Sequence, residues 1–91
     1  MPLIAKLIRV SGNVQGVFFR AWTKQQADEL GISGWVRNRP DGSVETLVAG
    51  EAQAVSSIID RMRRGPPAAT VERLIEEPTE DAPDAGFLVR H

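Results

Sequence analysis

The sequence ISGWVRNRPDGSVETLVA, residues 32–49, is typical of two strands joined by a tight turn. Pro40 fixes φ near the value that a turn requires, and Gly42 accepts a positive φ at little steric cost. Apolar and polar residues alternate on the far side of the turn, as they do in a strand with one buried face. We therefore expect strands over residues 32–39 and 43–49, paired as a β-hairpin.

A helical pattern flanks this hairpin on each side. Before it, from about Arg20 to Leu30, apolar residues recur at helical spacing, and Gly31 is a suitable C-terminal stop. After it, a second apolar stripe ends at Gly65. The stripe of the first helix is Phe19, Trp22, Ala27 and Leu30, and that of the second is Val55, Ile58, Ile59 and Met62. Thr23, Lys24 and Gln26 are expected on the surface or margins of the first helix.

The outer segments supply further strands. Residues 3–10 alternate as a strand does, residues 70–76 do so imperfectly, and residues 86–90 allow a short final strand. The acidic, proline-containing stretch 76–84 is expected to be an exposed loop. The order strand, helix, strand, strand, helix, strand predicts an α+β fold. We expect a ferredoxin-like βαββαβ two-layer sandwich, with an antiparallel sheet, two helices on one face and a possible short fifth strand.

Composition narrows the function. The chain has 91 residues, which predicts one domain over residues 1–91. It has no cysteine and its single histidine is His91, so thiol chemistry, disulfides and a histidine-based metal site are not expected. The net charge of −1 argues against nucleic-acid binding and against a polybasic membrane anchor. No apolar run approaches the roughly 20 residues of a spanning helix, which favours a cytoplasmic location.

The predicted loop from Ser11 to Gly16 contains two glycines and leads directly into the first predicted helix. Helix N-termini present unpaired main-chain N–H groups that favour an anion, and glycine lets a phosphate approach the main chain. Arg20 falls in the first helical turn, where a cation costs about 0.3–1 kcal/mol at an exposed site. A bound anion would explain this arginine, because a guanidinium grips two phosphate oxygens as a fork. An arginine that simply extends into solvent explains it equally well.

Asn38 is the second candidate. In the predicted topology the first and second strands run parallel, so the loop after the first strand and the end of the second lie at one edge of the sheet. Residues 12–20 and Asn38 should therefore be neighbours. An amide both donates and accepts hydrogen bonds, so Asn38 could position a water molecule. An asparagine before a turn also has a purely structural explanation. Arg37 and Arg39 beside it would make the rim locally basic, although exposed arginines at strand ends are common.

Two motifs in these segments resemble the signatures of the acylphosphatases. The first is Gly12-x-Val14-Gln15-Gly16-Val17-x-Phe19-Arg20, and the second is Gly34-Trp35-Val36-Arg37-Asn38-x-x-x-Gly42-x-Val44. The closing Gly86-Phe87-x-Val89-Arg90 is similar to the family's final strand. The resemblance covers nearly the whole chain. Two residues depart mildly from the family pattern. Phe18 stands at a position where that pattern often has a smaller or more variable residue, and Asn13 at a position where it often has a basic one.

The resemblance implies a hydrolase that cleaves the carboxyl–phosphate anhydride of small acyl phosphates to a carboxylate and inorganic phosphate. It implies that Arg20 and Asn38 are catalytic, with Arg20 binding the phosphoryl group and Asn38 orienting the attacking water. It assigns phosphate binding to the loop amides of Gln15, Gly16, Val17, Phe18, Phe19 and Arg20. No metal and no cofactor are expected, and inorganic phosphate is expected to act as product and inhibitor. We expect a monomer without nucleic-acid or membrane partners.

Two other functions fit the same fold class. An RNA-binding module shares this element order but stacks bases on aromatic residues of its central strands, and residues 3–10 and 43–49 contain none. The second alternative is a non-catalytic phosphate- or anion-binding regulatory module. The physiological acyl phosphate cannot be inferred from the sequence, and acetyl phosphate, carbamoyl phosphate and 1,3-bisphosphoglycerate are all candidates by resemblance.

Overall fold

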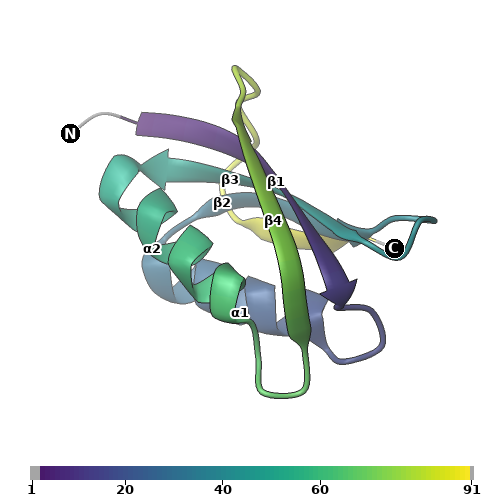
Figure 1. Cartoon of the computed structure of the whole chain (residues 1–91). Helices are drawn as coiled ribbons and strands as arrows, with labels where there is room; N and C mark the ends of the chain where they lie inside the picture. The colour runs from purple at the N-terminus through teal and green to yellow at the C-terminus, as the bar shows by residue number, and fades with distance from the viewer. Residues whose placement is uncertain (1–2, 91) are drawn as a thin grey trace.

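The computed structural model describes residues 3–90, and these form two helices and five strands (Figure 1). In chain order the elements are β1 (Leu3–Asn13), α1 (Phe19–Leu30), β2 (Ser33–Asn38), β3 (Val44–Glu51), α2 (Ala52–Arg64), β4 (Thr70–Pro78) and β5 (Phe87–Arg90). This order confirms the predicted βαββαβ arrangement with a short fifth strand. The strand boundaries differ by no more than three residues from those predicted.

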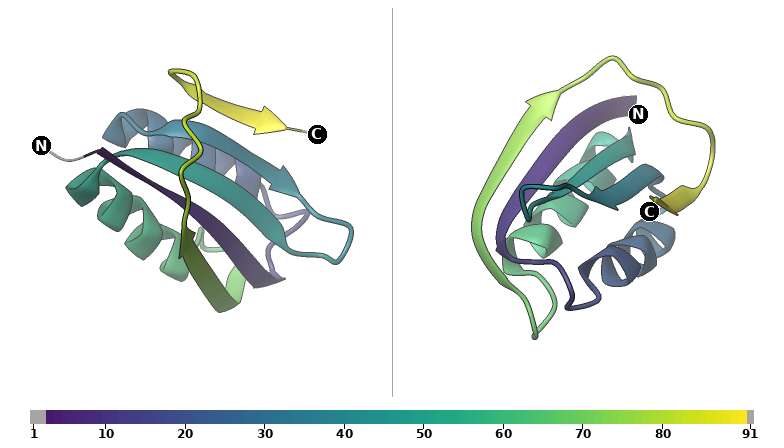
Figure 2. Two further views of the ribbon diagram at one scale, coloured as in Figure 1. Left: turned by 90° about the horizontal axis from the view of Figure 1, so that it is seen from above. Right: turned by 90° about the vertical axis from the view of Figure 1, so that its right-hand side faces the viewer.

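The strands form one sheet in the order β4-β1-β3-β2-β5. Strands β1 and β2 both pair antiparallel with β3, so they run parallel to each other, as the sequence predicts. Both helices cover one face of the sheet, and the segment between β4 and β5 crosses the other face (Figure 2). The result is the expected two-layer sandwich. Neither helix within residues 3–90 has the length and apolar character needed to cross a membrane.

The sheet is mixed rather than wholly antiparallel, because β5 pairs parallel with β2. The topology explains this difference. Strand β4 pairs antiparallel with β1 and therefore ends at the end of the sheet where β2 begins. The chain then crosses the open face of the sheet and enters β5 from that same end, so β5 must follow the direction of β2 (Figure 2).

The predicted turn between β2 and β3 is confirmed. The N–H of Arg39 donates to the carbonyl of Ser43 at 2.8 Å, and the N–H of Gly42 donates to the carbonyl of Arg39 at 3.1 Å. The carboxylate of Asp41 accepts from the main-chain N–H of Ser43 at 2.9 Å and from its hydroxyl at 2.6 Å. The turn is thereby tied at both ends, which fixes the point at which β2 ends.

Strand β1 extends further than predicted. Residues 11–13 were expected to be loop, but they continue the pairing with β4 after a register shift between Ser11 and Gly12. At Gly12, where φ is +127°, an added Cβ would lie 2.2 Å from the carbonyl oxygen of Thr70. Only glycine allows the two strands to approach this closely. The loop between β1 and α1 is consequently short, since it runs from Val14 to Phe18.

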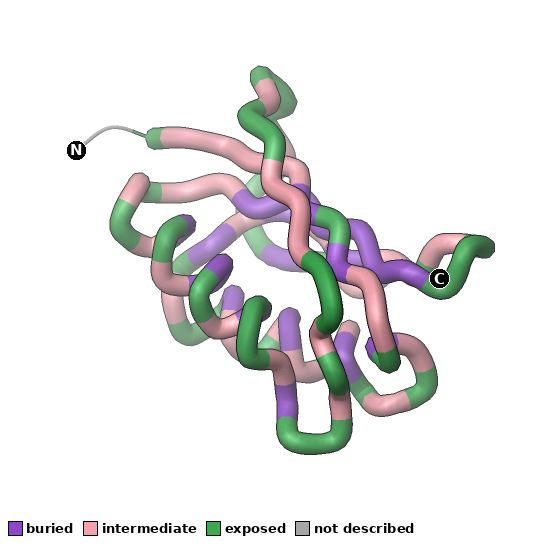
Figure 3. Tube along the Cα trace, in the orientation of Figure 1, coloured by how far each residue is buried: buried purple, intermediate pink, exposed green. Residues whose placement is uncertain are grey.

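The core lies between the sheet and the two helices (Figure 3). Strand residues of the inner face pack there against the stripes of α1 and α2. The fully buried side chains include Ile8, Val10, Val36, Val44, Val48, Phe19, Val55, Ile58 and Met62. One expectation is wrong: Thr23 is not on the surface of α1 but fully buried. It lies one turn from Phe19 and one turn from Ala27, so the helix packs along the line that these three residues form.

Candidate active site

A pocket lies where the loop after β1 meets the end of β2 and the last strand. Its volume is about 300 Å³, and it is lined by Val14, Gly16, Phe18, Phe19, Arg20, Ala21, Asn38 and Val89. The two residues singled out from the sequence, Arg20 and Asn38, therefore share one cavity although they belong to different elements. The juxtaposition predicted from strand order is confirmed.

The N-terminus of α1 forms one wall of this pocket. No side chain of the described residues caps it, and its first turn contains no acidic residue. The first N–H groups of a helix have no partner within the helix, and the helix dipole places partial positive charge at this end. The wall therefore presents main-chain donors and a cation, Arg20, on the same turn. Such a surface suits an anion rather than a neutral or cationic ligand.

The side chain of Arg20 is held by the last strand. Its Nη1 donates to the main-chain carbonyl of Arg90 at 3.0 Å. A carbonyl acceptor offsets part of the cost of placing a cation in the first turn of a helix. The contact also restricts the rotamers of a long side chain, so less conformational entropy is lost when the guanidinium binds a ligand. Strand β5 thus contributes to the site through the main chain as well as through Val89.

Gln15 connects the loop to the hairpin. Its Nε2 donates to the carbonyl of Arg39 at 2.8 Å and to the carbonyl of Ser43 at 2.9 Å. Both hydrogens of the amide are therefore used at the base of the turn. Asn38, the residue just before Arg39, ends β2 and is exposed. Its position relative to the loop consequently depends on these two hydrogen bonds.

Four of the six loop residues predicted to bind phosphate line the pocket, and two do not. Gly16, Phe18, Phe19 and Arg20 line the pocket, whereas Gln15 and Val17 are not among its lining residues. Val17 is partly buried against the core cluster. Val14 and Val89 line the pocket but were not predicted to be site residues. Their apolar character gives no chemical signal in the sequence, and only the position of β5 beside β2 brings Val89 there.

An ionic cluster lies on the open face of the sheet beside the hairpin. The side chain of Glu45 is 6% exposed and pairs with three arginines: Arg9 at 3.6 Å, Arg39 at 3.1 Å and Arg37, whose Nε donates at 2.9 Å. Burial raises the pKa of Glu45, but the hydrogen bond from Arg37 and the three positive charges outweigh it, so the pKa lies below its ordinary value. Arg37 and Arg39 thus have a structural partner at the rim.

Trp35 also lies on this open face rather than in the core. The guanidinium groups of Arg37 and Arg90 lie 5.2 and 5.1 Å from the centre of its indole ring. These distances are typical of cation–π contacts. The indole thereby links the strand that ends at Asn38 to the strand that holds Arg20, since Trp35 belongs to β2 and Arg90 to β5.

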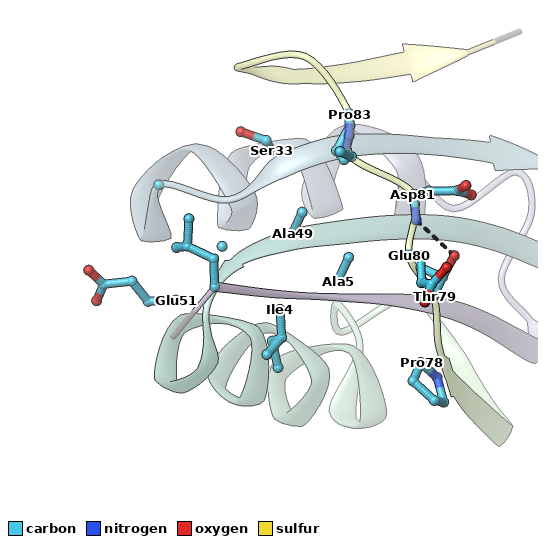
Figure 4. A pocket seen from close by; sticks show the side chains of 14 residues that line it. Ile4, Ala5, Ser33, Ala49, Glu51, Pro78, Thr79, Glu80, Asp81 and Pro83 are labelled. Carbon is cyan, nitrogen blue, oxygen red and sulfur yellow. Dashed lines mark hydrogen bonds between the residues drawn. The ribbon is translucent and has the colours of Figure 1, made fainter. Parts of the chain in front are cut away.

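A larger cavity of about 760 Å³ lies at the opposite end of the sheet, under the segment after β4 (Figure 4). Small apolar side chains such as Ala5 and Ala49 line it together with three carboxylates, those of Glu51, Glu80 and Asp81. None of the described residues that line it is basic. Because like charges repel, this cavity does not suit a phosphorylated ligand. The cavity after β4 has the greater volume, but its acidic lining makes the smaller pocket at Arg20 the better candidate for the functional site.

Known proteins resemble this chain over most of its length. A family model described as acylphosphatase matches residues 6–89, a span that contains the loop, the hairpin and most of the last strand. The chain belongs to the acylphosphatase family. A relative named acylphosphatase from Rhizorhabdus wittichii is 55% identical over 84 residues, covering 92% of this chain and 85% of the relative.

Solved structures of this family have the same fold. The structure of an acylphosphatase from Coxiella burnetii superposes with a TM-score of 0.92 at 35% identity, covering 97% of this chain and 93% of the other. The crystal structure of acylphosphatase from Bacillus subtilis superposes with a TM-score of 0.91 at 32% identity, covering 99% and 100%. The ferredoxin-like architecture predicted from element order is thus the architecture of the family.

Proposed function

We propose that the chain hydrolyses the carboxyl–phosphate anhydride of small acyl phosphates at the pocket between α1, β2 and β5. The observation that supports this most directly is the meeting of Arg20, Asn38 and the uncapped N-terminus of α1 in one cavity. Membership of the acylphosphatase family supports the same reaction. The products are a carboxylate and inorganic phosphate.

The phosphoryl group is bound by the main-chain N–H groups of residues 15–20 and by Arg20. Phosphoryl transfer depends mainly on positioning and on neutralising the charge of the equatorial oxygens. N–H groups and a guanidinium supply both, and they need no reorganisation during the reaction. The anchoring of Arg20 by the carbonyl of Arg90 supports this role, because it holds the guanidinium beside the pocket.

Asn38 orients the attacking water from the opposite side of the pocket. The water oxygen forms a bond to phosphorus as the bond between phosphorus and the carboxylate oxygen breaks. The proton of the water passes to a phosphate oxygen, so the products are inorganic phosphate and the free carboxylate. An acyl phosphate already has a good leaving group, and this route requires no side chain that titrates near neutral pH. Among residues 3–90, those that line the pocket include no carboxylate, histidine or lysine.

Metal independence is part of the proposal. Among residues 3–90, no three His, Cys, Asp or Glu side chains gather as metal ligands would. The positive charge in the proposed mechanism comes from Arg20 and from main-chain dipoles, and a divalent ion has no step to perform. The absence of a cofactor, the monomeric state and the cytoplasmic location expected from the sequence stay predictions.

The decisive experiment measures phosphate release from benzoyl phosphate by purified protein in EDTA, with Arg20→Gln as the comparison. We expect turnover in EDTA that disappears in Arg20→Gln, together with inhibition by inorganic phosphate. Circular dichroism and thermal unfolding of the variant show whether the contact with Arg90 is needed for folding. Phosphate binding without any turnover by the folded chain would instead indicate the non-catalytic anion-binding module.

A further inference from the structure

The side chain of Phe18 is exposed where an aromatic ring contributes little to folding. It is 85% exposed, more than the other large apolar side chains with high exposure in residues 3–90, Leu3 at 76% and Leu88 at 66%. Phenylalanine stabilises a protein mainly by removing its ring from water. Because this ring stays in water, burial does not explain why the position carries phenylalanine.

The backbone of Phe18 does not explain the choice either. Its φ is 61° and its ψ is 23°, which is the left-handed region, and it is the one non-glycine residue with positive φ among residues 3–90. Glycine adopts this conformation at little cost and asparagine tolerates it, whereas a bulky side chain is strained there. Strained backbone of this kind clusters at functional sites.

Phe18 lines the same pocket as Arg20 and Asn38. The pocket has a polar part, formed by these two residues and the helix N-terminus, and an apolar part to which Phe18, Val14 and Val89 contribute. Val14 is buried and Val89 is partly buried, so Phe18 is the apolar residue of the three that projects most into solvent. A ligand anchored at the polar part would extend from there toward solvent.

Building on the proposed function, we propose that Phe18 is a specificity-determining residue that contacts the acyl group of the substrate. Every acyl phosphate presents the same phosphoryl group to Arg20 and the loop, so any discrimination that the protein adds to the intrinsic reactivity of its substrates must come from contacts with the acyl group. A phenyl ring offers dispersion and ring–ring contacts, and it offers no hydrogen bond. The substrates favoured by this site are acyl phosphates with an apolar acyl group, and an aromatic one above all.

The test uses a ratio of two substrates, benzoyl phosphate and carbamoyl phosphate. The first has an aromatic acyl group, and the second has a small polar one. The ratio of their kcat/KM values cancels any change in the phosphoryl-binding loop, since both substrates share that end. In Phe18→Ala the ratio should fall about three- to tenfold, as expected for the loss of one ring–ring contact. In Phe18→Tyr the ratio should stay near that of the wild type.

Two further variants make the result specific. Phe18→Asn removes the ring but tolerates the left-handed backbone, so it should fold at least as well as the wild type and lower the ratio as Phe18→Ala does. Leu88→Ala removes an exposed apolar side chain of β5 that does not line this pocket, and it should leave the ratio unchanged.

A ratio that stays within about twofold of the wild type in Phe18→Ala and Phe18→Asn overturns the inference and leaves the hydrolase proposal intact. A fall in Phe18→Tyr as large as in Phe18→Ala overturns it too, because the ring is still present. If the wild type hydrolyses neither substrate, it is the proposed function that fails.

Discussion

The side-chain amide of Gln15 lies 2.8 Å from the carbonyl oxygen of Arg39, so the loop after β1 and the end of β2 are joined by a direct hydrogen bond. A second hydrogen bond from the same nitrogen, to Ser43, closes the link across the turn. Gln15 is thereby held beside the pocket to two residues that lie 24 and 28 positions further along the chain. Asn38 is the last residue of β2 and directly precedes Arg39, which accepts the first of these hydrogen bonds. The position of Asn38 relative to Arg20 therefore follows from this connection.

We expect Gln15→Ala to lower kcat more than it weakens phosphate binding. The loss of two hydrogen bonds should reduce the free energy of unfolding by about 1–2 kcal/mol. Asn38 would be positioned less well, and kcat should fall roughly tenfold, since small displacements of a reacting group are costly. Gln15→Met is the matched control for size: a thioether cannot donate to the two carbonyls and adds no charge beside the phosphate-binding loop, so it should behave as Gln15→Ala does. Equal losses in kcat and in phosphate affinity would contradict a positioning role.

Substitution of Asn38 should separate binding from turnover. In Asn38→Ala the loop and Arg20 are unchanged, so the inhibition constant for inorganic phosphate should stay within about threefold of the wild type. Turnover should fall by at least about a hundredfold, the usual effect of removing one polar group that acts on the reacting atoms. Steady-state kinetics with phosphate as the inhibitor measures both quantities. A parallel loss of phosphate affinity would mean that Asn38 holds the phosphate rather than the water.

Glu45 should make stability depend on pH in the acidic range. Its pKa is lowered in the folded protein from the ordinary value of 4.5, because the contribution of Arg37, Arg39 and Arg9 exceeds the opposing effect of burial. A lowered folded pKa means that the unfolded chain binds the proton more readily. The stabilising contribution is therefore complete above the unfolded pKa and is lost as the pH falls from about 4.5 through the lower folded value.

The variant Glu45→Gln tests this contribution. At neutral pH it should lower the free energy of unfolding by about 1–3 kcal/mol, because the carboxylate that accepts hydrogen bonds from Arg37 and Arg39 and pairs with Arg9 loses its charge. Below pH 4 the difference from the wild type should shrink, as the wild-type carboxyl becomes protonated. Urea unfolding at several pH values measures this. Glu80→Gln, at an exposed residue of the loop after β4, is the comparison and should change the stability little. A constant difference between wild type and Glu45→Gln at all pH values would contradict the assignment.

Local chemistry made the hairpin and the element order predictable. Pro40 and Gly42 define a turn through their own backbone preferences, and the two helical stripes need no knowledge of their partners. The parallel pairing of β5 was not predictable in this way, since it depends on the path of the chain across the open face of the sheet. The burial of Glu45 was not predictable either, because the residues that shield it from water are arginines from β1, β2 and the turn, which come together only in the folded sheet.

The candidate site could be predicted as far as its polar residues. Arg20 is unusual at the start of a helix, and strand order brings Asn38 to it. The hydrogen bonds of Gln15 could not be predicted, because the sequence resemblance placed this residue in the loop through its main chain alone. The left-handed conformation of Phe18 has no local sequence signal either. It depends on how the loop joins a helix whose orientation is set by packing.

The last prediction concerns Thr23, which was expected on the surface or margins of α1 but lies in the core. Its side chain is fully buried, and its hydroxyl has no hydrogen-bond partner among residues 3–90. A buried hydroxyl without a partner costs the free energy of removing it from water. Thr23→Val keeps the shape of the side chain and removes the hydroxyl, so the free energy of unfolding should rise by about 1 kcal/mol. Thr23→Ser keeps the hydroxyl and removes the buried methyl group, so it should be destabilising by about 1 kcal/mol. Urea unfolding of the two variants beside the wild type measures both shifts. If Thr23→Val is instead the less stable of the two, the hydroxyl makes a hydrogen bond that stabilises α1, and the buried face of that helix is more polar than its neighbours indicate.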